Sequence, residues 1–219
     1  MKAFLFDLNG TMIDDMGYHI KAWHTLLNSL GANISLERTK EECYGKNGEL
    51  LERVFPGRFS EEEKNKIGYA KEEQYQREFR PHLQLIKGLD QFLAAAHRQH
   101  IKMAIGSAAI TFNIDFVLDG LNIRHYFSSI VSADHVIKSK PDPETYLTCA
   151  AELGIAPENC IVFEDAPKGV EAAQNAGMQS VVITTMHTKE EFGAYTNIIG
   201  FIEDYTAPWL QETVLTAPV

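Results

Sequence analysis

The sequence has few cysteines and no long apolar run. Three cysteines, Cys43, Cys149 and Cys160, cannot all pair with one another, and their spacing matches neither CxxC nor a metal site. We therefore expect free thiols, which is consistent with a reducing compartment. The apolar run at the N-terminus is broken by Asp7 and is too short for a signal-peptide core or a membrane span. These absences lead us to expect a cytoplasmic protein.

Positive charge is also scarce. Acidic residues outnumber basic ones 30 to 20, the formal net charge is -10, and no cluster of lysine and arginine appears. A broad nucleic-acid or anionic-membrane surface is therefore excluded, and we expect neither partner. The 219 residues, 45% of them hydrophobic, are enough to bury a core and argue against disorder. We expect a monomer, although the sequence does not determine the oligomeric state.

Short apolar segments alternate with helical patterns. The segments expected to be strands are rich in β-branched residues and cover residues 2–6, 101–107, 129–133, 160–163 and 180–183. Helical spacing of apolar residues is found at 88–99, 112–121, 143–153 and 167–176. Alternating βα units predict an α/β, Rossmann-like fold, with a parallel sheet and helices on both faces.

Residues 15–80 interrupt this alternation. Their pattern is helical throughout, most clearly at 18–30, 48–55 and 61–80, and no strand is expected between the first strand and Ile101. An insertion after the first strand of such a sheet lies above the carboxyl ends of the strands, where ligands bind. We therefore predict a core of residues 1–14 and 81–219 and a four-helix cap of residues 15–80.

Polar residues stand where the predicted strands end. They are Asp7, Asn9, Ser107, Lys140, Glu164 and Asp165. Three converging carboxylates repel one another unless a cation lies among them, and oxygen ligands without a His or Cys cluster favour Mg²⁺. Mg²⁺ in turn suggests a phosphate. Lys140 offers a positive charge and Ser107 a hydroxyl, and we expect the amides of Ser107 and Ala108 at a helix start, where they would cradle the phosphate.

Four motifs in order along essentially the whole chain carry a resemblance to a known family. They are Asp7-Leu-Asn-Gly-Thr11, Gly106-Ser-Ala108, Lys140-Pro-Asp-Pro143 and the segment 164–173, which begins Glu-Asp-Ala-Pro-Lys-Gly. With them the sequence resembles the haloacid dehalogenase superfamily, in the β-phosphoglucomutase-like group with a helical cap after the first strand.

The resemblance implies a role for each of these residues. Asp7 is the nucleophile that becomes a phosphoaspartate, and Ser107 and Lys140 bind the transferring phosphoryl group. The Asp7 carboxylate, the backbone carbonyl of Asn9, and Asp165 hold Mg²⁺, with Glu164 as a direct or water-mediated ligand.

The cap resembles the group in part. Residues 18–23 match its first cap helix, so His19 is expected to help position the acid/base residue. Lys71 matches a cap lysine that faces the substrate. Packing for His19 and simple solvation for Lys71 remain open readings of the two residues. Gly48 stands where the mutase has an arginine that grips a second phosphate, which argues against recognition of a bisphosphate.

Asn9 is the larger departure, because the family's phosphatases and mutases have an aspartate there that moves protons. A carboxamide keeps the shape but cannot shuttle a proton, so turnover is expected to fall by about 10² to 10⁴. Three explanations stay open: an engineered substitution, a natural slow variant, or different chemistry such as carbon–halogen hydrolysis. The last is the weakest, because halide displacement does not use Mg²⁺.

The sequence is therefore best interpreted as a Mg²⁺-dependent phosphatase of small phosphate esters, most plausibly sugar phosphates, slowed by Asn9. Two alternatives are a β-phosphoglucomutase-type phosphomutase and a catalytically silent protein that binds a phosphorylated ligand. The sequence does not identify the ester.

Overall fold

The computed structural model describes residues 2–215. The chain forms two compact units, of which one consists of Asp15–Leu83 and the other of the segments before and after it, Met1–Asp14 and Gln84–Val219. We call the first unit the cap and the second the core. Each is described by itself below.

The core is built on one parallel sheet of six strands in the order β3-β2-β1-β4-β5-β6. The central strand β1 pairs with β2 on one side and β4 on the other, so that Phe6 lies opposite Ile105 and Phe163. The strands are β1 (Ala3–Phe6), β2 (Lys102–Gly106), β3 (Ser129–Val131), β4 (Cys160–Glu164), β5 (Gln179–Ile183) and β6 (Ile198–Ile202). The prediction of an α/β fold with a parallel sheet is confirmed.

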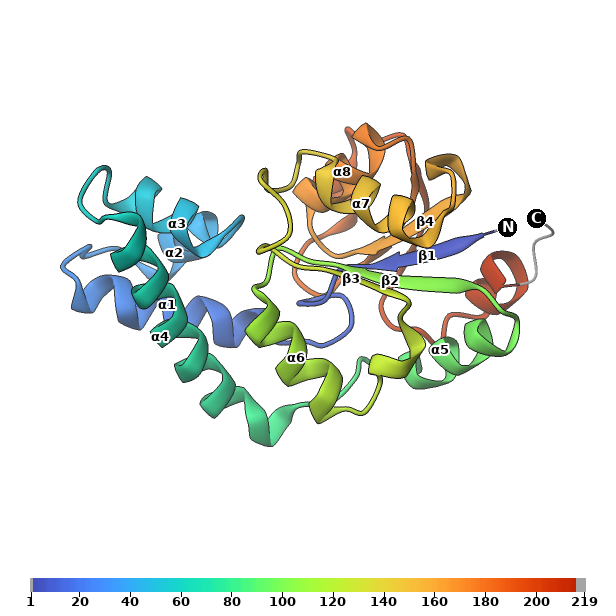
Figure 1. The fold of residues 1–219 in the computed structure, drawn as a ribbon, viewed down its shortest axis with the longest axis horizontal. Helices are drawn as coiled ribbons and strands as arrows, with labels where there is room; N and C mark the ends of the chain where they lie inside the picture. The colour runs from blue at the N-terminus through green and yellow to red at the C-terminus, as the bar shows by residue number, and fades with distance from the viewer. Residues whose placement is uncertain (1, 216–219) are drawn as a thin grey trace. The chain divides into compact units, whose positions relative to one another are not determined.

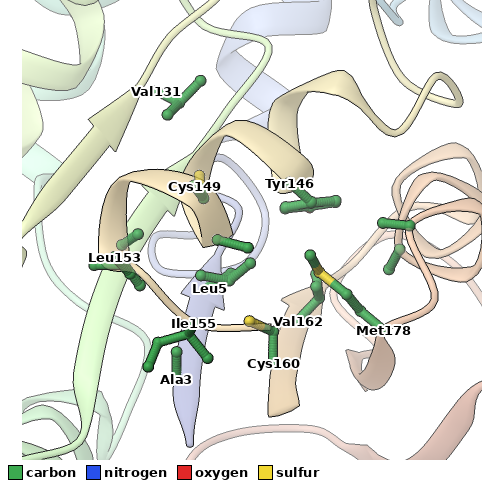
Figure 2. Packing of buried hydrophobic residues seen from close by; sticks show 14 of the residues in the cluster. Ala3, Leu5, Val131, Tyr146, Cys149, Leu153, Ile155, Cys160, Val162 and Met178 are labelled. Carbon is green, nitrogen blue, oxygen red and sulfur yellow. The ribbon is translucent and has the colours of Figure 1, made fainter. Parts of the chain in front are cut away.

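Side chains of β1 alternate between the two faces of the sheet, as the period of a strand requires. Ala3 and Leu5 belong to the apolar cluster that includes Tyr146 and Leu153 of α7 (Glu144–Leu153), which Figure 2 shows. Phe4 and Phe6 point to the other face, where Phe4 stacks on Phe92 at 5.6 Å between ring centroids. Both faces of β1 are therefore covered, and the strand is wholly buried.

In the described part of the chain, four helices cover the sheet, with α7 and α8 on one face and α5 and α6 on the other (Figure 1). Besides α7, their bounds are α5 (Leu89–Arg98), α6 (Thr111–Gly120) and α8 (Pro167–Asn175). Short 3₁₀ turns lie at Arg80–His82, Arg124–Tyr126, Pro157–Asn159 and Lys189–Phe192, and one π-helical segment lies at Leu210–Leu215. None of the helices within residues 2–215 is both long enough and apolar enough to cross a membrane.

Two details of the sheet differ from the sequence expectation. The edge strand β6 was not predicted, because its centre is Gly200 and most of it is only partly buried. A side chain at Gly200 would collide with the Trp209 ring, 2.5 Å from the position of its Cβ, so packing selects a glycine inside this strand. The third strand ends at Val131 rather than at residue 133, where the chain turns toward the loop that carries Lys140.

The cap is helical, with α1 (Met16–Ser29), α2 (Leu36–Glu42), α3 (Asn47–Val54) and α4 (Glu61–Phe79). Ser60 begins α4 by accepting a bond from the Glu63 amide, and the Glu63 carboxylate accepts one from the Ser60 amide. Trp23 and Leu27 of α1 pack against Leu50, Leu51 and Phe55 and form the apolar centre of the unit.

Candidate active site

Three carboxylates meet at the carboxyl ends of two neighbouring strands. Asp7 directly follows β1, Glu164 is the last residue of β4, and Asp165 follows it. Because β1 and β4 are adjacent and parallel, their ends bring the three groups together, and one oxygen of each lies within 4.8 Å of the others. All three side chains are buried. Residues that are far apart in the sequence thus share one small site.

Lys140 reaches this cluster from the loop after β3. Its Nζ donates to Asp7 Oδ1 at 2.8 Å and to Glu164 Oε1 at 2.7 Å. The Lys140 side chain is 8% exposed, and its ammonium group crosslinks two carboxylates that would otherwise repel each other. One lysine therefore partly balances three acids.

The turn after Asp7 positions Asp165. Thr11 Oγ1 donates to Asp165 Oδ1 at 3.1 Å. Gly10 has a φ of +75°, and a Cβ there would lie 2.1 Å from Asp165 Oδ2, so only glycine fits this approach. The Gly10 carbonyl accepts a bond from Thr185 Oγ1 at 2.7 Å, which ties the turn to the segment after β5.

The electrostatics of the cluster favour a bound cation. Burial, together with the charges of Glu164 and Asp7, raises the pKa of Asp165 well above its usual range. Burial opposes the charge of Lys140, but the charges of Asp7 and Glu164 outweigh it and raise the pKa of this lysine. The cluster has three acids against one base and offers only oxygen ligands, a donor set that fits Mg²⁺.

The remaining predicted residues of the core lie at neighbouring positions. Asn9 is partly buried in the turn two residues after Asp7. Ser107 directly follows β2, is 1% exposed, and donates its amide to the Val131 carbonyl at 3.0 Å. Since β2 pairs with β1, the ends of both strands lie at the same edge of the sheet.

The expectation that Ser107 and Ala108 stand at a helix start is wrong, because α6 begins only at Thr111. The Ser107 hydroxyl accepts a bond from the Ala109 amide at 3.1 Å, which makes a turn before the helix. The amide and hydroxyl of Thr111 are bound by Asp134 Oδ2, each at 2.8 Å. A phosphate near Ser107 would therefore meet loop amides rather than the N-terminus of α6.

Tyr146 is part of the site but was predicted only as an apolar position of a helix. Its hydroxyl donates to Glu164 Oε1 at 2.8 Å, and the Lys140 Nζ lies 4.6 Å from its ring centroid. Burial and the neighbouring Glu164 charge raise the pKa of Tyr146, which therefore stays a donor. The spacing of apolar residues in the sequence predicted that Tyr146 lies on the buried face of its helix. Its contact with Glu164 depends on the tertiary fold and could not be predicted in this way.

The two predicted cap residues, His19 and Lys71, lie together in a buried network of the cap. His19 Nδ1 and Lys71 Nζ are 2.6 Å apart, and Lys71 also donates to Glu72 Oε2 at 2.9 Å. His19 Nε2 pairs with Asp15 at 3.2 Å, and Asp15 accepts the Tyr75 hydroxyl at 2.5 Å. The sequence had not indicated Asp15, Glu72 or Tyr75 as partners, because helical spacing does not show which buried polar groups meet.

Residues 4–183, which are most of the chain, match the family described as haloacid dehalogenase-like hydrolase. The chain belongs to this family. A fructose-1-phosphate phosphatase of Escherichia coli is 29% identical over 179 residues, covering 82% of this chain and 94% of that protein. A β-phosphoglucomutase of Bacillus subtilis is 31% identical over 189 residues, covering 83% of this chain and 82% of that protein.

Solved structures of the family have the same fold. The crystal structure of β-phosphoglucomutase from Clostridium difficile has a TM-score of 0.83 and 28% identity, and covers 97% of this chain and 96% of that one. As a haloacid dehalogenase-like hydrolase with phosphatase and phosphomutase relatives, the chain is an enzyme of this type.

Proposed function

We propose that this haloacid dehalogenase-like hydrolase is a Mg²⁺-dependent phosphatase of small phosphate esters. The observation that carries the proposal is the buried cluster of Asp7, Glu164 and Asp165, crosslinked by Lys140 at the strand ends. Three carboxyl groups against one ammonium group suit a divalent cation together with the anionic phosphoryl group.

The residues present fit Mg²⁺. Asp7, the backbone carbonyl of Asn9, and Asp165 would hold the ion, with Glu164 as a direct or water-mediated ligand. Bound there, the ion would neutralise charge on the phosphoryl oxygens. The raised pKa of Asp165 supports this assignment, because a cation would relieve the repulsion that raises it.

The protein's own steps follow from the same residues. An Asp7 oxygen attacks phosphorus, a bond between that oxygen and phosphorus forms, and the bond from phosphorus to the ester oxygen breaks. Lys140 and Ser107 hold the phosphoryl oxygens during this transfer. Water then attacks the phosphoaspartate, which releases phosphate and restores the Asp7 carboxylate.

Asn9 limits both halves of this cycle. The departing ester oxygen needs a proton, and the attacking water must lose one. A carboxamide can neither supply the first proton nor accept the second. We propose that the chain is for this reason slower than its Asn9→Asp variant by about 10² to 10⁴ on unactivated esters.

Sugar phosphates are the proposed substrate class, because relatives named for phosphatase and mutase activity act on them. The β-phosphoglucomutases among these relatives make a phosphomutase the second candidate. Gly48 favours the phosphatase, because it provides no side-chain charge for a second phosphate. By resemblance we keep His19, Lys71 and the Ala108 amide as proposed substrate-side groups.

The deciding experiment measures phosphate release from a panel of sugar phosphates with Mg²⁺, for the chain and for Asn9→Asp. A strong gain on restoring the aspartate supports an enzyme scaffold. Conversion of a sugar 1-phosphate to its 6-phosphate without phosphate release would support the mutase. Binding without turnover in both proteins would contradict the proposal and favour a silent binding protein.

A further inference from the structure

The Glu164 carboxylate is held by four donors. Oε1 accepts from Lys140 Nζ at 2.7 Å and from the Tyr146 hydroxyl at 2.8 Å. Oε2 accepts from the backbone amides of Asp165 and Ala166, both at 3.0 Å. An ionised carboxylate presents about four lone-pair sites, so these bonds use its accepting capacity. A metal ion bound directly to Glu164 would have to displace one of the four donors.

The space around this carboxylate is closed as well. Glu164 is 1% exposed. On the side of α8, a Cβ at Gly169 would lie 1.8 Å from Oε1 and 2.5 Å from Oε2, so the helix backbone itself covers the carboxylate. The backbone amides fix Oε2, while Oε1 is left to hold two side chains.

Tyr146 meets both members of the Lys140–Glu164 pair. Its hydroxyl binds the carboxylate, and its ring lies 4.6 Å from the ammonium, within the range of a cation–π contact. The ring is fully buried and is fixed by the backbone of β2, since a Cβ at Gly106 would lie 3.1 Å from two ring atoms. Figure 2 shows Tyr146 within the core cluster, on the same helix as Cys149. The tyrosine is thus a rigid support.

We propose that Glu164 anchors Lys140 rather than ligating the metal directly, and that Tyr146 is the positioning residue that holds this anchor. The inference rests on the proposed function and sharpens it. Asp7, the Asn9 carbonyl and Asp165 are then the protein's direct ligands. Glu164 and Tyr146 act on the phosphoryl group through Lys140.

The test separates metal binding from phosphate binding. Calorimetry with the full chain measures the affinity for Mg²⁺ alone, and then the affinity for inorganic phosphate at saturating Mg²⁺. Tyr146→Phe keeps the ring and removes the hydroxyl, so the Mg²⁺ affinity should stay within about twofold while the phosphate affinity falls about tenfold, the effect of one hydrogen bond to a charged group. The matched control is Tyr195→Phe, because Tyr195 packs beside Val170 and Phe192. This variant should change neither the Mg²⁺ affinity nor the phosphate affinity.

Two carboxamide variants test the anchor itself. Asp165→Asn should lower the Mg²⁺ affinity at least about 100-fold, because a direct ligand and its charge are lost. Glu164→Gln has one acceptor oxygen where the carboxylate has two, so it cannot serve both the backbone amides and the Lys140–Tyr146 pair. It should therefore weaken phosphate binding strongly, but weaken Mg²⁺ binding at least about tenfold less than Asp165→Asn does.

The double variant Tyr146→Phe/Glu164→Gln completes the test. If Tyr146 acts through Glu164, removing its hydroxyl has no further effect on phosphate affinity in the Glu164→Gln background. Additive losses would overturn the positioning role. Equal losses of Mg²⁺ affinity in Glu164→Gln and Asp165→Asn would overturn the anchor. Should Tyr146→Phe not fold, equal phosphate losses in Lys140→Met and Glu164→Gln, with none added in their double variant, still support the anchor, and additive losses overturn it.

These readouts do not depend on turnover. A chain that binds Mg²⁺ and phosphate as expected but hydrolyses no ester would contradict the proposed function and leave the roles of Glu164 and Tyr146 standing. A chain that hydrolyses sugar phosphates, but in which Glu164→Gln abolishes Mg²⁺ binding, would do the reverse.

Discussion

Two buried polar clusters, one in each unit of the molecule, differ in how their charges are balanced. In the core, the carboxylates of Asp7, Glu164 and Asp165 share one ammonium group, that of Lys140. In the cap, two carboxylates, Asp15 and Glu72, lie against two bases, His19 and Lys71. The core cluster therefore has three acids for one base, whereas the cap cluster contains a base for each acid.

The pKa directions follow this difference. In the core, burial and neighbouring acids raise the pKa of Asp165. In the cap, burial opposes ionisation of Glu72, but Lys71 and His19 outweigh it and hold the pKa of this carboxyl below its usual value. Burial alone therefore does not mark a metal site. The ratio of acids to bases distinguishes the two clusters, because buried carboxyl groups without a basic partner must either take up protons or share a bound cation.

The largest expected effect separates a reacting carboxylate from a structural one. Asp7→Asn should abolish phosphoryl transfer, lowering turnover by at least about 10⁵-fold, because the nucleophile is lost. Asp15→Asn, the same change in the cap cluster, should cost less than about 100-fold, because it removes a partner of His19 and Tyr75 rather than the attacking atom. Steady-state rates with one substrate compare the two, and equal losses would contradict the assignment of the nucleophile.

Metal removal should affect the core cluster and spare the cap. Treatment with a chelator should lower turnover by at least about 10³-fold, and Mg²⁺ should restore it. Adding Mg²⁺ at 100 times its Kd to the metal-free protein should also raise its free energy of unfolding by about 2.7 kcal/mol. Thermal melts should show this stabilisation in the parent and in Glu72→Gln, but not in Asp165→Asn. If the stabilisation by Mg²⁺ were lost in Glu72→Gln instead, the cation would bind in the cap, which would contradict the proposal.

Asn9→Asp would restore an aspartate two residues after Asp7 and should raise turnover of sugar phosphates by about 10² to 10⁴. The gain should be much smaller for p-nitrophenyl phosphate, whose leaving group departs without a proton. In the chain as it stands, acetyl phosphate should load Asp7 quickly and the phosphoaspartate should break down slowly, giving a burst in rapid-quench experiments. Equal gains for activated and unactivated esters, with no burst, would exclude residue 9 as the position of proton transfer.

The remaining expected effect is on stability alone and lies in the cap. Glu72→Gln leaves Lys71 buried without its carboxylate partner and should destabilise the protein by about 3 kcal/mol at pH 7. Because the folded-state pKa of Glu72 is below its unfolded value of 4.5, its contribution is fully present above pH 4.5 and is lost as pH falls through the folded pKa. Urea unfolding of parent and variant should therefore differ most near neutral pH and converge in acid. A difference independent of pH would contradict the charge pairing.

Much of the fold could be predicted because β1 to β5 are buried on both sides and read as apolar runs, with polar residues directly after them. The half-exposed β6 escaped, since Gly200 interrupts its apolar pattern for a reason found only in the packing of Trp209. The seven-residue helix α2 was counted in the predicted four-helix cap but was not located, because its sequence LERTKEE has almost no apolar spacing.

The acidic residues of the site could be predicted from the sequence, whereas the residues that hold them in place could not. Asp7, Glu164 and Asp165 lie at the carboxyl ends of strands, so their meeting depends only on strand order. The contact between Tyr146 and Glu164 depends on how α7 is rotated over the sheet. Likewise, α6 begins at Thr111 rather than at Ser107 because a turn comes between them. That turn is stabilised by the bond from the Ala109 amide to Ser107 and by the bond from the Thr111 amide to Asp134. Contacts of this kind are made by tertiary packing, which local spacing does not encode.

The central place of β1 in the sheet also bears on the order in which the protein matures during synthesis. The cap is one continuous segment, so all of its residues have been made before Gln84 is added. The core is different, because β1 is synthesised first yet must wait for β4 before its second edge is paired. Contacts between segments so distant in sequence form late and slowly. The acidic cluster therefore cannot exist in any nascent chain that ends before Asp165, and the proposed metal site can form only once β4 has been made and can pair with the first strand.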